Sequence, residues 1–277
     1  MSFKYRKPHR LKRKKPIWNH RFFGITILFL VAIISVSYFL FFSHFFEIEK
    51  IIVWGEKKAA EEEIIKLIEK NLSQKRILLA ANNIFWADLD QTKEDILAQF
   101  PEIGELSFDR SFPQTLNCHV TERVPRATFC QSFAAEEGEG ENCFLLDKLG
   151  IAFEEVSTED ILLPKIQKSG QALELKLGKS IISPQLISNI LEIFSQLTDM
   201  EIGVQEINIL SQERINARTT GGWEIYFNPQ KDLTWQLTKL RAVLDKYILP
   251  QRRSNLEYIE LRFGNLAPFK YQGQPEQ

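Results

Sequence analysis

The chain has 277 residues, of which 44% are hydrophobic and 26% are charged, with 35 Lys and Arg against 36 Asp and Glu. This composition excludes a collagen-like or disordered chain and predicts one to three globular domains. The charge is unevenly distributed. Residues 1–21 carry nine Lys and Arg and no acid, whereas residues 47–277 carry 26 Lys and Arg against 36 Asp and Glu, a net charge of −10. A region with that net negative charge does not attract phosphates, which argues against nucleic-acid binding by residues 47–277.

An uncharged run of 25 residues extends from Phe22 to Phe46. A helix of that length would be about 37 Å long, against about 30 Å of hydrocarbon in a bilayer. The basic tail before the run and the acids Glu47 and Glu49 after it predict a cytoplasmic N-terminus. A cleaved signal sequence is the alternative, but the run ends without a small-x-small cleavage site. We therefore expect an uncleaved, single-pass membrane anchor in contact with the lipid bilayer.

The three cysteines fit an extracytoplasmic location for the rest of the chain. Cys130 and Cys143 flank a predicted loop and are able to pair across it, although the sequence leaves their pairing open. Cys118 lies in a strand-like run and is predicted to be a buried thiol. The cysteine spacings match no zinc pattern and the four histidines form no cluster in the sequence, so no metal site is predicted.

The segment after the anchor predicts the order strand, helix, helix, strand, strand. The predicted elements are a strand at 48–53, a helix at 59–72, a helix capped by Asp90, and strands at 103–108 and 115–122. Three glutamates open the first helix, at the positive end of its dipole, and Pro101 ends the second. A turn is expected at 109–114, and the last strand alternates apolar and polar residues.

Two motifs in this segment resemble those of an FtsQ-type POTRA domain. The first is Arg110-Ser111-Phe112-Pro113-x-Thr115-Leu116, at a turn and the strand that follows it. The second is Glu122-Arg123-x-Pro125-x-Ala127, at the exit of that strand. Shorter matches are Val53-x-Gly55, Pro101-x-Ile103 and Phe108-Asp109. The resemblance implies a POTRA domain at 47–126.

The rest of the chain is similar to the C-terminal region of the FtsQ/DivIB cell-division proteins. The segment 143–153 resembles a hairpin of that family, in which an Asp-x-x-Gly turn, here Asp147 to Gly150, joins two strands. An acidic loop is expected at 136–141, before this turn. Further predicted elements are a helix from Ser183 with Pro184 at its first position, strands at 207–210, 214–219 and 223–227, a helix over 233–248, and a closing strand at 258–263.

The resemblance extends over residues 1–271 and implies an α+β fold with five parts. These are a basic cytoplasmic tail at 1–21, a transmembrane helix at 22–46, the POTRA domain at 47–126, a β-rich domain with two helices at 127–271, and a disordered tail at 272–277. One departure from the family pattern is Glu260, which replaces the Asp usual before Leu-Arg.

Catalytic motifs are missing from the sequence. There is no Gly-x-Ser-x-Gly elbow, Ser-x-x-Lys set or His-Glu-x-x-His motif. Gly138-x-Gly140 lies among four glutamates, which would repel a phosphate. Neighbouring acids such as Glu154 and Glu155 do not establish the pair of carboxyls, about 5–10 Å apart, that a glycosidase needs. We therefore expect neither an enzyme nor a cofactor.

The resemblance implies a non-enzymatic scaffold of the divisome, at the division septum, which supports septal peptidoglycan synthesis. In this family the closing strand recruits a small single-span coiled-coil protein, FtsB/DivIC, by strand addition at an exposed sheet edge, and FtsL-type proteins are further partners. If this role of the closing strand applies to the present sequence, Arg262 would pair with a partner carboxylate and Phe263 would fill an apolar pocket of the partner. The remaining residues carried over are Gly264, Asn265 and Leu266, which would continue the pairing, and Arg214 as a second charge.

Other interpretations remain open at this stage. In the predicted strand Phe263 lies on the same face as Ile259 and Leu261, so its position is equally compatible with the core and with an interface. Arg262 is also compatible with an ordinary solvated charge. The chain is also compatible with a POTRA protein for secretion or membrane assembly, although 277 residues leave little room for the β-barrel usual in that class. A membrane-anchored cell-wall enzyme is the third class.

Overall fold

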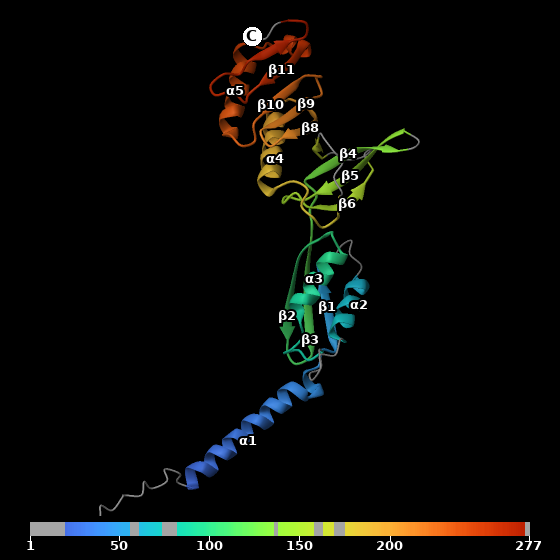
Figure 1. Ribbon diagram of the computed structural model, residues 1–277, viewed down its shortest axis with the longest axis vertical. Helices are drawn as coiled ribbons and strands as arrows, with labels where there is room; N and C mark the ends of the chain where they lie inside the picture. Colours follow the sequence, from blue (N-terminus) through green and yellow to red (C-terminus); the bar gives the residue numbers. More distant parts are fainter. Residues whose placement is uncertain are drawn as a thin grey trace, which may run out of the picture. The chain divides into compact units, whose positions relative to one another are not determined.

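The computed structural model describes residues 20–55, 61–73, 82–135, 138–157, 163–168 and 175–274. The predicted α+β fold is confirmed, with one apolar N-terminal helix, a small three-stranded region and a β-rich C-terminal region (Figure 1). The chain falls into two compact units. Unit 1 comprises residues 1–52, 69–88 and 110–117, and unit 2 comprises residues 53–68, 89–109 and 118–277. The predicted cytoplasmic tail at 1–21 lies almost entirely outside the described residues.

Helix α1, His20–Phe42, begins unit 1. Its 23 residues correspond to about 34 Å of length, and Phe22–Phe42 is long and apolar enough to cross a membrane. The helix ends four residues before the uncharged run does. Ser43 adopts an extended conformation and its hydroxyl accepts a hydrogen bond from the amide of Phe45 at 3.2 Å, which starts the short 3-10 helix η1, His44–Phe46. The predicted span at 22–46 therefore consists of two helical pieces.

The region that follows has the predicted order of elements. They are β1 (Lys50–Trp54), α2 (Glu61–Leu72), α3 (Leu89–Gln99), β2 (Ile103–Ser111) and β3 (Thr115–Glu122), and the sheet order is β1-β3-β2. The prediction that Asp90 caps α3 is wrong, because the helix already begins at Leu89 and Asp90 lies in its first turn. Gly55 has a φ of +92°, and a Cβ there would lie 2.3 Å from the carbonyl oxygen of Val120, so only glycine fits.

The C-terminal region is one nine-stranded sheet in the order β12-β11-β10-β9-β8-β7-β4-β5-β6. Its strands are β4 (Ala127–Ala135), β5 (Gly138–Leu146), β6 (Ala152–Val156), β7 (Lys165–Lys168), β8 (Val204–Ser211), β9 (Arg214–Thr219), β10 (Glu224–Phe227), β11 (Leu256–Glu260) and β12 (Phe269–Tyr271). Helices α4 (Pro184–Asp199) and α5 (Leu233–Lys246) pack on the same side of strands β8 to β11 (Figure 1). The buried core lies between these helices and the sheet.

Local signals for turns and helix ends are confirmed. The Ser183 hydroxyl accepts a hydrogen bond from Leu186 N at 3.4 Å, and Pro184 opens α4. In the turn between β5 and β6, Asp147 Oδ1 accepts from the amides of Leu149 and Ile151 at 2.9 and 3.0 Å. Gly150 takes the expected positive φ of +72°. These bonds stay within a few residues of chain, which explains why sequence alone predicts them.

A buried ion pair ties this turn to the end of β3. Arg123 Nη1 lies 2.5 Å from Asp147 Oδ2, and the two side chains are only 12% and 8% exposed. Arg123 Nε also donates to the carbonyl of Pro101 at 3.0 Å. Arg123 and Asp147 come from the two separate motifs that the sequence analysis identified. The pair therefore gives both motifs a shared structural role within unit 2.

The hairpin of β4 and β5 differs from the sequence prediction. A loop was expected at 136–141, but strand pairing continues outward to Ala135 and Gly138, and 136–137 lie outside the described residues. Glu141 accepts hydrogen bonds from Lys165 and Gln167, both at 2.9 Å, which offsets its charge within the sheet. Cys130 and Cys143 are opposite one another in this hairpin and form a disulfide. Cys118 is a buried free thiol, as predicted.

The closing strand is shorter than predicted and does not form the sheet edge. The prediction was a strand at 258–263, but β11 ends at Glu260 and pairs with β10 on one side and β12 on the other. Leu261 N still donates to Tyr226 O of β10 at 3.0 Å, and the chain turns at 263–265. The edge strand is β12, three residues that have no sequence period long enough to predict them.

Candidate functional site

The residues predicted to bind a partner lie in the loop between β11 and β12. Phe263 is 54% exposed and Leu266 is 70% exposed, and Gly264 and Asn265 between them are exposed as well. Phe263 is therefore not part of the core, and the alternation that seemed to place it with Ile259 ends with the strand. The loop presents two apolar side chains to solvent, three positions apart.

Helix α5 holds this loop through its main chain. Lys239 is only 6% exposed, and its ammonium group donates three hydrogen bonds to the loop. The acceptors are the carbonyls of Leu261, Phe263 and Leu266, at 2.7, 3.1 and 2.9 Å. Burial lowers the pKa of Lys239, partly opposed by the negative charge of Glu260.

Two other side chains from the start of α5 and the turn before it reach the same loop. Trp235 Nε1 donates to the carbonyl of Gly264 at 3.2 Å, and Lys231 Nζ donates to the carbonyl of Arg262 at 3.1 Å. Lys231, Trp235 and Lys239 are four residues apart, which places them in one row along the helical direction. The carbonyls of the loop are therefore bound from one side, while Phe263 and Leu266 stay exposed.

Arg262 is paired inside the chain. Its guanidinium donates to both carboxylate oxygens of Glu260, with Nε at 2.8 Å and Nη2 at 2.5 Å. The hydrogen bond to Glu260 raises the pKa of Arg262, and Glu260 itself is buried. The guanidinium carbon lies 5.7 Å from the ring centroid of Phe263. A partner carboxylate would therefore meet an arginine that already has a fixed orientation.

Arg214 belongs to an aromatic cluster across strands β9, β10 and β11. Its guanidinium carbon lies 4.4 Å from the ring centroid of Tyr226, which stacks on Tyr258 at 5.0 Å. Burial, together with the neighbouring Glu224, raises the pKa of Tyr226 to about 12. The structure thus places Arg214 on β9, which β10 separates from β11 in the same sheet, with its charge over an aromatic ring.

The outer side of β12 offers main-chain groups for pairing. Pro268 O accepts from Glu260 N at 2.8 Å and Gln272 N donates to Asn255 O at 2.9 Å, so these residues face β11. Alternation along the strand then directs the N–H and C=O groups of Phe269 and Tyr271 away from β11. In the part of the chain that the structure describes, no strand pairs with this side of β12.

Sequence reasoning missed Lys239, Trp235 and the two stacked tyrosines. Lys239 falls beside the apolar stripe of α5, where a lysine is ordinarily expected to reach solvent. Its signal was the regular spacing of Lys231, Trp235 and Lys239, each four residues after the one before, next to buried Leu240. Tyr226 and Tyr258 have no sequence signal, because a parallel pairing between β10 and β11 brings them together.

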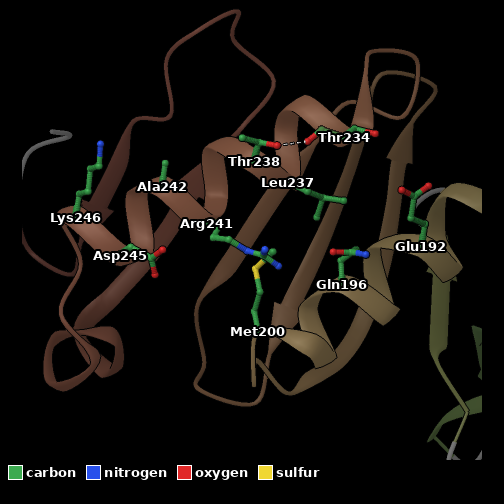
Figure 2. Close-up of a pocket in the computed structure, with 10 residues that line it drawn as sticks. All are labelled: Glu192, Gln196, Met200, Thr234, Leu237, Thr238, Arg241, Ala242, Asp245 and Lys246. Atoms are coloured by element: carbon green, nitrogen blue, oxygen red, sulfur yellow. Dashed lines mark hydrogen bonds between the residues drawn. The ribbon is translucent and has the colours of Figure 1, made fainter.

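A groove of about 470 Å³ lies between α4 and α5 (Figure 2). Figure 2 shows Glu192 and Gln196 on α4, and Met200 directly after it, facing Leu237 and Arg241 on α5. The groove carries acids and bases side by side and no cluster of buried titratable groups. Among the described residues, the one group with metal-ligand types is Cys130, Glu141 and Cys143, and both sulfurs are already joined in the disulfide.

The fold defines a class of protein, namely a POTRA protein with one apolar N-terminal helix and a β-rich C-terminal region. Two family models match the chain. An FtsQ-type POTRA domain matches residues 46–123, and the C-terminal domain of cell division protein FtsQ/DivIB matches residues 136–262. No curated protein matches the chain. The chain belongs to the FtsQ/DivIB family, whose members are non-enzymatic scaffolds of the divisome. Helix α1 fits a single-pass protein of that family.

Proposed function

We propose that this protein is a single-pass scaffold of the bacterial divisome that recruits FtsB/DivIC-type and FtsL-type proteins through its extracytoplasmic region. Recruitment at the septum would support septal peptidoglycan synthesis. The proposed parts are the cytoplasmic tail at 1–21, the span at 22–46, the POTRA domain at 47–126 and the β-rich domain at 127–271. Of the tail expected to be disordered at 272–277, Gln272 and Gln274 donate hydrogen bonds to Asn255 O and Tyr271 O. The family assignment supports the role in cell division.

The proposed orientation rests on the charges and on the cysteines. Nine Lys and Arg precede the apolar helix, and this excess favours a cytoplasmic N-terminus. The disulfide between Cys130 and Cys143 supports an oxidising compartment for unit 2. A scaffold and its partners anchored in the same membrane meet at high effective concentration, so modest contacts are sufficient for recruitment.

The observation that carries the proposed mechanism is the open edge at β12 beside a preformed loop. A partner strand would pair with the outward N–H and C=O groups of Phe269 and Tyr271. Phe263 and Leu266 would then serve as apolar anchors next to the added strand, with Arg262 held in place by Glu260. This differs from direct addition to β11, whose second side is occupied by β12.

The test compares two substitutions at one position in the full-length chain. Phe269→Ala and Phe269→Pro both remove the ring, but only proline also removes the outward N–H. Proline at an edge position whose N–H faces outward leaves the internal ladder of the sheet intact. The wild type and both variants would be used to capture a co-expressed FtsB/DivIC-type protein from detergent-solubilised membranes, with circular dichroism as the folding check.

We expect capture by the wild type and by Phe269→Ala, and loss of capture by folded Phe269→Pro. Equal capture by all three would exclude strand addition at β12. Loss of capture in both variants would instead assign the binding to the Phe269 ring, which packs against Tyr271 with centroids 5.7 Å apart. No capture of the co-expressed protein by the wild type would contradict recruitment itself.

A further inference from the structure

Aromatic side chains gather at the C-terminal end of α1, within unit 1. They come from three parts of the chain that are far apart in sequence. These are the end of α1 with η1 (Phe41, Phe45 and Phe46), the segment after residue 81 (Phe85 and Trp86), and the turn between β2 and β3 (Phe112).

The rings form a continuous series of contacts. The ring centroids of Phe41 and Trp86 are 5.0 Å apart, those of Phe41 and Phe85 are 6.4 Å apart, and those of Phe46 and Phe85 are 5.2 Å apart. Phe85 in turn lies 5.1 Å from Phe112. These distances are in the range of favourable aromatic pairs. The last turn of the apolar helix is therefore connected through rings to the tip of the β2–β3 hairpin.

Hydrogen bonds fix the segment that carries Phe85 and Trp86 against the helix end. Asn83 is 2% exposed, and its amide group donates to the carbonyls of Leu40 and Phe41 at 3.2 and 3.4 Å. The amide of Ile84 donates to the carbonyl of Phe46 at 2.8 Å. Asn83 thus satisfies carbonyls that the end of a helix leaves without partners. The position of Trp86 beside Phe41 does not depend on ring contacts alone.

The outer rings of the cluster are exposed among the residues that the structure describes. Phe45, Trp86 and Phe112 are 55%, 47% and 58% exposed, whereas Phe85 at the centre is half-buried. Exposed aromatic side chains in a contiguous group mark an interaction surface more often than isolated ones do. What covers these three rings follows from where they lie along α1.

The depth of the cluster is set by Phe41, which is in the last turn of α1. If α1 spans the bilayer, its length of about 34 Å brings that turn to the boundary between hydrocarbon and headgroups. A ring 5.0 Å from Phe41 lies at that same boundary. Trp and other amphipathic aromatic side chains are enriched there.

We propose that Phe45, Trp86 and Phe112 form a membrane-contacting surface that enters the interfacial region of the leaflet next to the C-terminal end of α1. The occupant is the lipid surface, because the three rings continue directly from the apolar helix. The inference rests on the span in the proposed function. Unit 1 is then attached to the bilayer by side chains on three segments as well as by the helix.

The experiment measures depth in the membrane with the full-length chain. A nitrobenzoxadiazole probe is attached to Ser111→Cys, which is exposed and adjoins Phe112 without removing any of the three rings. The chain is reconstituted into phosphatidylethanolamine and phosphatidylglycerol vesicles that contain lipids with nitroxides at the headgroup or deep in the acyl chain. Iodide in the water reports aqueous access. A second protein carries the probe at Leu30→Cys, inside α1.

We expect acyl-chain nitroxides to quench the probe at residue 30 and headgroup nitroxides to quench the probe at residue 111, with weak quenching by iodide. Trp86→Ala with Phe112→Ala should abolish the headgroup quenching at residue 111 and raise the iodide quenching. The matched control is Tyr247→Ala with Leu249→Ala, which removes two exposed side chains from unit 2 and should change neither signal.

The outcomes separate this inference from the span on which it rests. Free iodide access at residue 111, with deep quenching at residue 30, overturns the membrane-contacting surface and leaves the span in place. An unchanged signal in the Trp86→Ala and Phe112→Ala protein also overturns it, because the rings would then not provide the contact. Quenching of the residue 30 probe by iodide rather than by lipid overturns the span itself and the surface with it.

Discussion

Two buried cations each hold a turn in unit 2, and they do so in different ways. Arg123, at the end of β3, contacts the carboxylate of Asp147 in the β5–β6 turn. Lys239, on α5, reaches the β11–β12 loop and contacts three main-chain carbonyls. The nearby acid that acts on Lys239, Glu260, is bound to Arg262.

The difference shows how the kind of partner determines what a buried charge does. A carboxylate in contact compensates a buried guanidinium directly, and its loss leaves an unpaired charge inside the protein. Carbonyl dipoles compensate an ammonium group less fully, so burial lowers the pKa of Lys239. The first arrangement stabilises the interior, whereas the second fixes the backbone of a loop whose side chains face solvent.

The largest expected effect tests the Arg123 side of this comparison. Arg123→Ala should lower the free energy of unfolding by about 3–5 kcal/mol, because Asp147 would remain buried without its partner. Denaturant unfolding of the full chain in detergent, followed by circular dichroism, measures it. The exposed Arg126→Ala is the control and should stay within about 0.5 kcal/mol of the wild type. Equal losses for the two variants would contradict a special role for the buried pair.

A smaller loss is expected on the Lys239 side. Lys239→Met keeps the aliphatic length but removes the donor to three carbonyls, which should cost about 1–3 kcal/mol of unfolding free energy. Amide hydrogen exchange should become faster for peptides covering 261–266. Lys231→Met removes only one bond at an exposed position and should leave that exchange nearly unchanged. Unchanged exchange in Lys239→Met would mean that the loop does not depend on the ammonium group.

At Tyr226, burial and a nearby cation have opposite effects on the pKa, because burial raises it and Arg214 lowers it. Its pKa is raised from 10.0 to about 12 by burial and by Glu224, although Arg214 lies over its ring. A raised folded pKa gives stability that is present below pH 10 and is lost as the pH rises towards 12. Absorbance of tyrosinate should show a late transition that Tyr226→Phe removes and Tyr247→Phe leaves in place. A late transition that persists in Tyr226→Phe would assign it to another tyrosine.

The smallest effect on stability is expected for the exposed side chain of Phe263 in the β11–β12 loop. Phe263→Ala should change the free energy of unfolding by no more than about 0.5 kcal/mol, because the ring is 54% exposed. If Phe263 anchors the partner, the same variant should weaken capture by about 2 kcal/mol or more. Leu249→Ala, at a similarly exposed position, is the control for both measurements. Lost stability with unchanged capture would place Phe263 in a structural role.

Features that depend on neighbouring residues could be predicted from the sequence. The Ser183 cap followed by Pro184 and the turn from Asp147 to Gly150 involve bonds that span a few residues. The order of elements in the first region and the buried state of Cys118 follow from periodicity. These features account for most of the fold that the sequence predicts.

Features that depend on distant pairing could not be predicted. Strand β12 has three residues and exists because β11 offers a free side. The bonds from Lys239 join residues more than 20 positions apart, and its polar head gave no reason to expect burial. The contact of Phe41 with Trp86 spans a still larger gap in unit 1. In the candidate site, Phe263 and Leu266 were found by resemblance, and the residues that hold their loop were not found.

The length of β12 has a consequence for copies of this chain that meet in the same membrane. A long, flat outer strand would pair with the outer strand of a second copy and lead to aggregation. Only Phe269 and Tyr271 direct main-chain groups outward from β12, and Pro268 precedes them. Two residues give too short a ladder to hold identical copies together without additional side-chain contacts. The short strand therefore favours a partner that also recognises the neighbouring loop.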